Sequence, residues 1–203
     1  MSIPFQDSET AKNLLRAFAG ESQARNRYDF AANLCQKQEL QAMAFIFQAT
    51  AKQEQAHAKV FWDHLQALNG QNLPIYGAYP IEGTNRILEL LRAAQHNEHE
   101  EHGSVYPSFA AIATQEGFPE AAASFRQIAA IEQLHGERFG LLADQLESGA
   151  LFVSQIETGW MCLNCGHTQN SLEAPKQCPV CNHGQGWFIR LELAPWSPVA
   201  KQT

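Results

Sequence analysis

The stretch Glu54-Gln55-Ala56-His57 recurs, with the same spacing, as Glu132-Gln133-Leu134-His135. Residues three apart on an α-helix lie on one face about one turn apart, so each stretch can direct a carboxylate and an imidazole towards the same point. This spacing is typical of metal ligands. A single copy is explained more simply as a solvent-exposed pair, so the interpretation depends on the second copy and on where both copies lie.

Both copies lie within the apolar stripe of a long amphipathic segment. The residues that recur at helical intervals are Phe47, Thr50, Glu54, His57, Phe61 and Leu65 in the first segment, and Phe125, Ile128, Glu132, His135, Phe139, Leu142 and Leu146 in the second. An ionised carboxylate away from water costs several kcal/mol unless it is paired. Because a bound cation removes that cost, the sequence predicts a metal site inside a helical bundle.

The first 150 residues predict four helices. The first is capped by Asp7 or Ser8 and fades near Gln38, and the second covers Leu40 to Leu68 before an Asn-Gly stop. Residues 71–83 are rich in Pro and Gly and form one long connection. The third helix runs from a Thr84 cap to Gly117, with Val105 and Ile112 on its inner stripe and a bend at Pro107. The fourth runs from Pro119 to Ser148-Gly149.

Each predicted helix brings a glutamate to its inner stripe, and two also bring a histidine. The set is Glu21, Glu54, Glu98, Glu101 and Glu132 with His57 and His135. This is the ligand set of a di-iron or di-manganese carboxylate bundle, and its five carboxylates need two cations to offset their charge. Glu54 and Glu132 are central and are expected to bridge the ions. Iron or manganese suits oxygen and imidazole ligands, and zinc also binds them.

The third helix allows several registers, because residues 95–102 contain three histidines and three glutamates. Spacing from Ile87 and Leu91 selects Glu98 and Glu101 for the inner stripe. The other charged or imidazole side chains of this stretch are then expected on a solvated face: His96, His99, Glu100 and His102. The alternative is that they form a second site. On the first helix, Arg25 follows Glu21 by one turn and is either a partner of that carboxylate or a surface guanidinium.

From Leu151 onwards the pattern changes to short β-prone pieces at residues 151–153, 157–160 and 187–193. Two Cys-x-x-Cys pairs, Cys162/Cys165 and Cys178/Cys181, are separated by twelve residues. This clustering predicts a tetrahedral thiolate site rather than disulfides, with iron or zinc as the metal. The fifth cysteine, Cys35, is expected to be a small buried hydrophobic residue.

Composition argues against two classes of partner. The formal net charge is −7 and the basic residues are few and scattered, so a nucleic-acid backbone is not an expected partner. No run of eighteen or more apolar residues is present, and the N-terminal stretch lacks the apolar segment of a secretion signal. We therefore expect a soluble cytoplasmic protein that does not bind membranes.

Taken together, these motifs resemble the rubrerythrin family. The helical resemblance includes Glu21-x-x-Arg25-x-x-Tyr28 and Tyr106-Pro107-x-Phe109, while Cys162-Leu163-Asn164-Cys165-Gly166 and Cys178-Pro179-Val180-Cys181 resemble rubredoxin. The resemblance implies a mainly α protein, with a ferritin-like four-helix bundle in residues 1–150 followed by a small β-rich, rubredoxin-like metal domain in residues 151–203. It implies two iron ions in the bundle and one iron ion held by the four cysteines.

The resemblance also implies a peroxidase that reduces hydrogen peroxide at the di-iron site. Electrons would pass through the four-cysteine iron from a donor such as a rubredoxin or its reductase. In the family, the carboxylate matching Glu101 binds iron in the diferric state and the imidazole matching His57 in the diferrous state. A homodimer is implied as well, because the relay iron of one subunit serves the di-iron site of another.

Two features leave alternatives open. Tyr28 and Tyr106 share the inner stripes, where they either hydrogen-bond a carboxylate or bound peroxide, or are core residues with satisfied hydroxyls. At the level of function, a ferritin-like protein that oxidises or stores iron with dioxygen would use the same helices. A non-enzymatic metal-binding or partner-binding module with a zinc ribbon is the second alternative.

Overall fold

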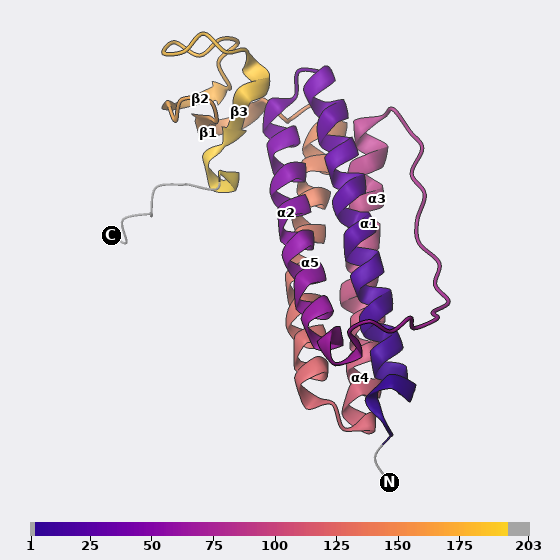
Figure 1. Ribbon diagram of the computed structural model, residues 1–203. Helices are drawn as coiled ribbons and strands as arrows, with labels where there is room; N and C mark the ends of the chain where they lie inside the picture. Colours follow the sequence, from indigo (N-terminus) through magenta and orange to yellow (C-terminus); the bar gives the residue numbers. More distant parts are fainter. Residues whose placement is uncertain (1–2, 195–203) are drawn as a thin grey trace.

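The computed structural model describes residues 3–194, which form a helical bundle with a small sheet at one end (Figure 1). The helices are α1 Glu9–Lys37, α2 Gln41–His64, α3 Ile87–Glu100, α4 Tyr106–Glu116 and α5 Pro119–Glu147. The mainly α class with a small β-rich end is therefore confirmed. The proposed boundary at residue 150 lies between α5 and the first strand, and residues 195–203 of the second proposed domain lie outside the described residues.

Most helix ends follow the local sequence signals. Ser8 caps α1, since its Oγ accepts a hydrogen bond from the Ala11 N–H at 3.0 Å. A 3-10 turn, Leu65–Leu68, extends α2, and Gly70 follows it with φ of +78°. Pro119 begins α5, and Gly149 follows that helix with φ of +70°. Glycine adopts this left-handed conformation without the steric cost that a Cβ brings, which is why these helices end there.

The predicted third helix differs in two ways. It begins at Ile87 rather than after Thr84, so the Thr84 cap was wrong. It is also divided by a π-helix, Glu101–Val105, which begins six residues before the expected bend at Pro107. Proline has no N–H to offer the carbonyl four residues earlier, and a π turn accommodates the loss.

The π-helix shifts the inner stripe by one residue. An unbroken α-helix would continue the stripe of Leu91 and Glu98 to Val105, whereas the buried residues of α4 are Tyr106, Ala110 and Ala113. Val105 and Ile112 are only half-buried, so their predicted place on the inner stripe was wrong. The shift therefore brings Tyr106 to the interior.

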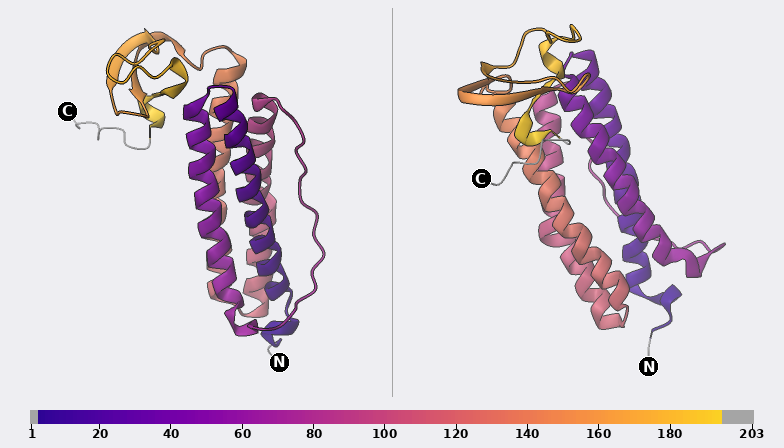
Figure 2. Two further views of the ribbon diagram at one scale, coloured as in Figure 1. Left: turned by 45° about the horizontal axis from the view of Figure 1, so that its top comes forward. Right: turned by 90° about the vertical axis from the view of Figure 1, so that its left-hand side faces the viewer.

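Residues 71–86 run along the length of the bundle beside α1 and α3 and carry the chain back to the end where α2 began (Figures 1 and 2). As a result α2 and α3 run parallel, as in ferritin-like bundles with one long crossover. Three contacts join this connection to α1, two at Arg16 and one at Arg27. Arg16 donates to the Tyr76 carbonyl at 2.9 Å, Tyr79 donates to the Arg16 carbonyl at 3.0 Å, and Arg27 pairs with Glu82 at 2.8 Å.

Two apolar clusters close the bundle interior above and below its centre. One contains Phe47 and Phe139, with ring centroids 5.0 Å apart, and the other contains Phe61 and Phe125, at 5.1 Å. Each pair joins α2 to α5, and each phenylalanine lies seven residues, about two turns, from the glutamate of its own Glu-x-x-His stretch. The polar centre is therefore sealed from solvent along the bundle axis.

A three-stranded antiparallel sheet follows, with β1 Val153–Cys162 in the middle, β2 Thr168–Glu173 on one side and β3 Phe188–Arg190 on the other. The piece predicted at 157–160 belongs to β1, but of the piece predicted at 151–153 only Val153 does, because Leu151 and Phe152 form a bend before the strand. The piece predicted at 187–193 is shorter, because 3-10 turns flank it. β2 was not predicted: its sequence is polar and its residues are largely exposed, so it lacks a buried apolar face.

The sheet packs on the end of the bundle where α1 turns into α2. Met161 and Ile189 belong to the same apolar cluster as Phe47. Gly186 lies so close to this turn that a Cβ there would stand 1.7 Å from the Glu39 carbonyl oxygen. The close approach needs a residue without a side chain, and it holds the cysteine-rich part of the chain against the bundle.

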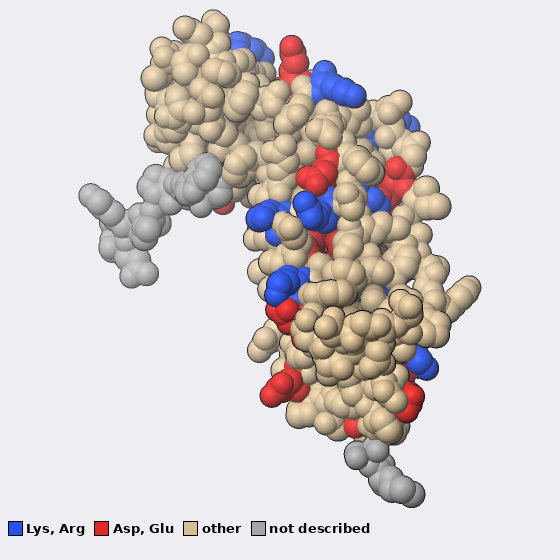
Figure 3. All heavy atoms as spheres, viewed as in Figure 1, with Lys and Arg blue, Asp and Glu red and all other residues tan. Residues whose placement is uncertain are grey.

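Charged groups of both signs are interspersed on the face of the molecule shown in Figure 3, without a continuous basic stripe there. Between residues 3 and 194, no helix combines the length and the apolar character needed to cross a bilayer.

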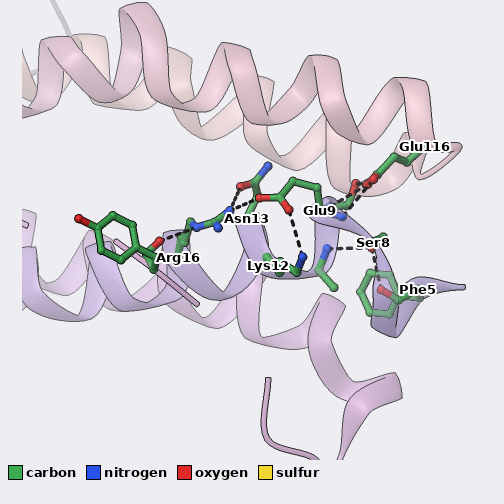
Figure 4. A network of polar contacts seen from close by, with 10 residues as sticks. Phe5, Ser8, Glu9, Lys12, Asn13, Arg16 and Glu116 are labelled. Carbon is green, nitrogen blue, oxygen red and sulfur yellow. Dashed lines mark hydrogen bonds and ion pairs between the residues drawn. The ribbon is translucent and has the colours of Figure 1, made fainter. Parts of the chain in front are cut away.

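At the opposite end of the bundle, the Glu116 carboxylate closes the start of α1 (Figure 4). It accepts hydrogen bonds from the N–H groups of Glu9 and Thr10 at 3.0 and 2.8 Å, and from the Thr10 hydroxyl at 2.5 Å. Partial burial acts to raise the pKa of Glu116, but these hydrogen bonds outweigh it and lower that pKa. The carboxylate therefore ties the end of α4 to the N-terminus of α1.

We expect Glu116→Gln to lower the free energy of unfolding by about 1–2 kcal/mol at neutral pH, because it removes a charge-assisted interaction with a helix N-terminus. Since the folded pKa lies below the unfolded value near 4.3, the stabilisation is present above that value and disappears as the pH falls through the folded pKa. Thermal denaturation at several pH values would measure it. Glu157→Gln, on the exposed part of β1, is the control, and an equal effect of both variants would contradict the expectation.

Candidate metal centres

Six side chains from four helices meet in the polar centre of the bundle, and all are buried. They form two overlapping groups whose candidate ligand atoms lie within 4.8 Å of one another: Glu21, Glu54, His57 and Glu132, and Glu54, Glu98, Glu132 and His135. We call these the Glu21 group and the Glu98 group. Glu54 and Glu132 belong to both.

Each shared carboxylate directs one oxygen towards each histidine. His57 Nδ1 lies 2.8 Å from Glu132 Oε1 and 3.1 Å from Glu54 Oε2. His135 Nδ1 lies 2.7 Å from Glu132 Oε2 and 3.0 Å from Glu54 Oε1. The arrangement has an approximate twofold symmetry that matches the sequence repeat. It is the geometry by which two carboxylates can bridge two cations.

The donor atoms fit a pair of metal ions. Several buried atoms facing this centre make no hydrogen bond of normal geometry within the described part of the chain, although some lie at ion-pair distance from one another: Glu21 Oε2, Glu54 Oε1, Glu98 Oε2, both oxygens of Glu132, and His135 Nδ1. A buried polar atom without a partner costs about 1–3 kcal/mol, so six together would be a heavy penalty. Two cations among them satisfy all six.

The pKa shifts of these side chains also indicate that the centre favours added positive charge. Burial raises the pKa of Glu21 and of Glu98 well above the usual range. Burial alone would lower the pKa of His57 and His135, but the carboxylates around them raise these values to about 12 and about 11. The shared carboxylates therefore favour the protonated form of both imidazoles, and metal binding competes with those protons.

Two buried tyrosines hold the outer carboxylates. The Tyr28 hydroxyl donates to Glu98 Oε1, and the Tyr106 hydroxyl donates to Glu21 Oε1. In each case the other oxygen, Oε2, is left facing the centre. Of the alternatives for these tyrosines, the structure has the hydrogen bond to a carboxylate, which orients a candidate ligand.

Glu101 belongs to neither group. It is half-buried at the first residue of the π-helix and lines a pocket of about 260 Å³ together with Gly20, Tyr79 and Tyr106. Burial, and then the negative charge of Glu21, raises the pKa of Glu101 well above the usual range. Glu101 therefore borders this pocket, and the charge of Glu21 acts on its carboxyl group.

The remaining polar residues of the third helical segment lie elsewhere. His96, His99 and Glu100 are exposed, as expected for a solvated face. For His102 the expected solvated position was wrong: the side chain is half-buried, and its Nδ1 lies 2.8 Å from the Ala129 carbonyl oxygen, which joins the π-helix to α5. Arg25 is exposed, which favours the surface alternative.

The four clustered cysteines form one group whose sulfur atoms lie within 4.8 Å of one another. The Sγ atoms of Cys162 and Cys181 are 3.7 Å apart, and those of Cys165 and Cys178 are 3.6 Å apart. Metal–sulfur bonds of about 2.3 Å in a tetrahedron give an edge of about 3.8 Å, so the spacing suits one metal ion. Cys35 is a free cysteine buried in the bundle core, as predicted.

Sequence reasoning missed three residues that the structure brings to the bundle site. Gln53 Oε1 lies 2.9 Å from His135 Nε2. Gly20 and Tyr79 border the pocket beside Glu101. The only sequence signal was position: Gln53 precedes Glu54, and Gly20 precedes Glu21. The partner of each comes from another part of the chain.

Comparison with known proteins agrees with both centres. The rubrerythrin family model matches residues 12–143, and the model for the rubrerythrin rubredoxin-like domain matches residues 160–189. Curated rubrerythrins from Porphyromonas gingivalis and Clostridium perfringens are 44% and 42% identical to this chain, covering 93% and 89% of it and 92% and 93% of their own length.

Solved structures agree at the level of the fold. The fully reduced, all-ferrous nigerythrin has a TM-score of 0.60 at 25% identity and covers 91% of this chain and 90% of its own. The bacterioferritin BfrA of Mycobacterium tuberculosis has a TM-score of 0.60 at 18% identity over 70% of this chain and 88% of its own, which shows the ferritin-like fold. The bundle centre is thus a di-iron carboxylate–histidine site and the four-cysteine site is an iron site. With its ferritin-like bundle followed by a rubredoxin-like end, the chain belongs to the rubrerythrin family.

Proposed function

We propose that this di-iron oxidoreductase is a peroxidase that reduces hydrogen peroxide to two water molecules, consuming two electrons and two protons. The observation that carries the proposal is the extra carboxylate, Glu101, at the pocket beside the Glu21 group. A symmetrical set of four glutamates and two histidines already suffices for two ions, so Glu101 is available for another role. The proposed iron ligands are the members of the Glu21 group, the Glu98 group and Glu101.

The pocket suits a substrate as small as hydrogen peroxide. When bound, the iron pair supplies the two electrons that break the O–O bond. The carboxyl group of Glu101, whose pKa burial raises, can hold a proton at the pocket and donate it to a departing oxygen. The Tyr106 hydroxyl, which also borders the pocket, keeps Glu21 oriented while Glu101 moves.

We further propose that His57 and Glu101 alternate as ligands of the ion in the Glu21 group. His57 belongs to that group, and among the charges that raise the pKa of Glu101, that of Glu21 is the largest. Glu21 therefore acts on both side chains: His57 Nδ1 lies 3.8 Å from Glu21 Oε2, and the charge of Glu21 raises the pKa of Glu101. As in the family, Glu101 would serve the oxidised state and His57 the reduced state.

Electrons would return through the iron held by Cys162, Cys165, Cys178 and Cys181, from a donor such as a rubredoxin or its reductase. A homodimer would let the relay iron of one subunit serve the di-iron site of its partner. The exposed position of Cys165 supports electron entry at the four-cysteine iron, because an electron donor can reach the site there.

Stopped-flow spectroscopy tests the reaction. The reduced protein is mixed with hydrogen peroxide or with dioxygen at equal concentration, and reoxidation is followed by absorption. We expect peroxide to react faster. Faster reaction with dioxygen would instead favour a ferritin-like iron oxidase.

The metal of the relay has a separate test. A ferric four-cysteine centre is red and a zinc centre is colourless, so visible absorption together with metal analysis distinguishes them. A colourless, zinc-containing protein that still folds would favour the non-enzymatic module with a zinc ribbon.

Access through the pocket can be tested at Gly20. A Cβ at this position would lie 3.6 Å from the Tyr79 ring and 4.0 Å from Glu101 Oε1, so alanine fits at ordinary contact distances. The larger side chain of leucine would enter the pocket. We expect Gly20→Leu to slow reoxidation by peroxide roughly tenfold or more, equivalent to about 1.4 kcal/mol of barrier, and Gly20→Ala to change it little. Equal rates for the two variants, with equal iron content, would argue against this route.

A further inference from the structure

The two histidines of the bundle site differ at the ring nitrogen that faces away from the centre. His135 Nε2 lies 2.9 Å from Gln53 Oε1, an amide oxygen that accepts a hydrogen bond from the ring N–H. A histidine bound in this way keeps one tautomer and one ring orientation, with Nδ1 directed at the metal. Among the residues that the structure describes, His57 Nε2 has no hydrogen-bond partner.

The sequence repeat explains the difference. In Gln53-Glu54-Gln55-Ala56-His57 and Ile131-Glu132-Gln133-Leu134-His135, the glutamates, the histidines and the residue after each glutamate correspond in type. The residue before each glutamate does not, because Gln53 corresponds to Ile131. The side chain of isoleucine has no hydrogen-bond acceptor. His57 therefore lacks the partner that His135 has.

We infer that the pair Gln53 and Ile131 decides which histidine can leave its metal ion. Gln53 is a positioning residue that holds His135 in place, whereas Ile131 leaves the His57 ring free to turn. The inference rests on the proposed alternation of His57 with Glu101, and it gives that alternation a physical cause. Glu101 offers a replacement ligand beside the Glu21 group, and the difference between Gln53 and Ile131 decides how readily the histidine there is released.

Nuclear magnetic resonance tests the positioning role without any redox chemistry. The full-length protein is loaded with zinc, which is diamagnetic, and labelled with ¹⁵N-histidine, with signals assigned by single-site variants. We expect the His135 Nε2–H to exchange with solvent at least about tenfold more slowly than the His57 Nε2–H, because a hydrogen-bonded proton must first be released. Equal exchange rates in the wild-type protein would overturn the inference.

Variants sharpen this test. Gln53→Leu should abolish the protection of His135, and Gln53→Glu, which keeps an acceptor, should retain it. Gln55→Leu is the matched control, because Gln55 lies on the same helix and, among the described residues, its side chain accepts only from Lys52, at 2.8 Å. Unchanged protection in Gln53→Leu, or loss in the control as well, would contradict a specific role for Gln53.

The converse variant, Ile131→Gln, places an acceptor at the position that the repeat relates to Gln53, which is 36% exposed and therefore open to a polar side chain. We expect the His57 Nε2–H of the zinc-loaded protein to become protected. In the iron-loaded protein, reoxidation by peroxide should slow about tenfold, or 1.4 kcal/mol. An unchanged rate despite a protected His57 would overturn the inference, whereas failure of the peroxidase proposal would appear separately, as faster reaction of the wild-type protein with dioxygen.

Discussion

Replacing Glu132 with glutamine is expected to leave the bundle unable to retain its two iron ions. Glu132 directs one oxygen to each histidine, at 2.8 and 2.7 Å, so both proposed iron positions depend on it. Glutamine keeps the shape but removes the negative charge, and its amide NH₂ turns a donor towards one cation. Loss of a residue that only supports a ligand weakens metal affinity about 10–100-fold, so we expect at least the upper end of that range here. Iron analysis after dialysis against a chelator would measure the loss.

The matched control for this variant is Glu137→Gln. Glu137 lies on the same helix and is exposed, and within residues 3–194 its carboxylate accepts only from Gln133. Its variant should retain the iron of the wild-type protein. If Glu132→Gln retained both ions at the same chelator concentration, Glu132 would not be a bridging ligand.

Replacing Cys178 with serine is expected to stop steady-state peroxide reduction but not the single-turnover reaction of reduced bundle iron with peroxide. Cys178 is fully buried, and its Sγ lies 3.6 Å from that of Cys165 in the proposed relay site. Without this thiolate the site should lose its iron, so electrons from the donor would no longer reach the di-iron site. We expect turnover to fall about 100-fold or more, equivalent to about 2.7 kcal/mol.

Two measurements separate the relay from general damage. The bundle iron, reduced chemically in the Cys178→Ser variant, should still react with peroxide at the wild-type rate in a single turnover. Cys35→Ala, which removes a buried cysteine far from the relay in sequence, should keep both activities. Loss of the single-turnover reaction, or full steady-state activity without relay iron, would show that electrons do not follow the proposed route.

Local spacing in the chain was enough to predict the helices and the residues that share their inner faces. Glu54 with His57 and Glu132 with His135 recur at the helical interval, and the cysteine pairs recur at the interval of a thiolate site. These features depend on residues three or four apart, whose relative directions the helix or the turn geometry sets. For that reason both metal centres and the order of helices and sheet were predictable.

What depends on contacts between distant segments appeared only in the folded molecule. The π-helix brings Tyr106 inward in place of Val105, because Pro107 and packing against α5 override the α-helical interval. Gln53 on α2 contacts His135 on α5, and Glu101 lines a pocket together with residues of the long connection between α2 and α3. Residue spacing along one helix carries no information about the partner that another helix presents. The tertiary structure therefore decides how two nearly equivalent metal positions come to differ, since it brings Gln53 to His135 and places Glu101 at a pocket.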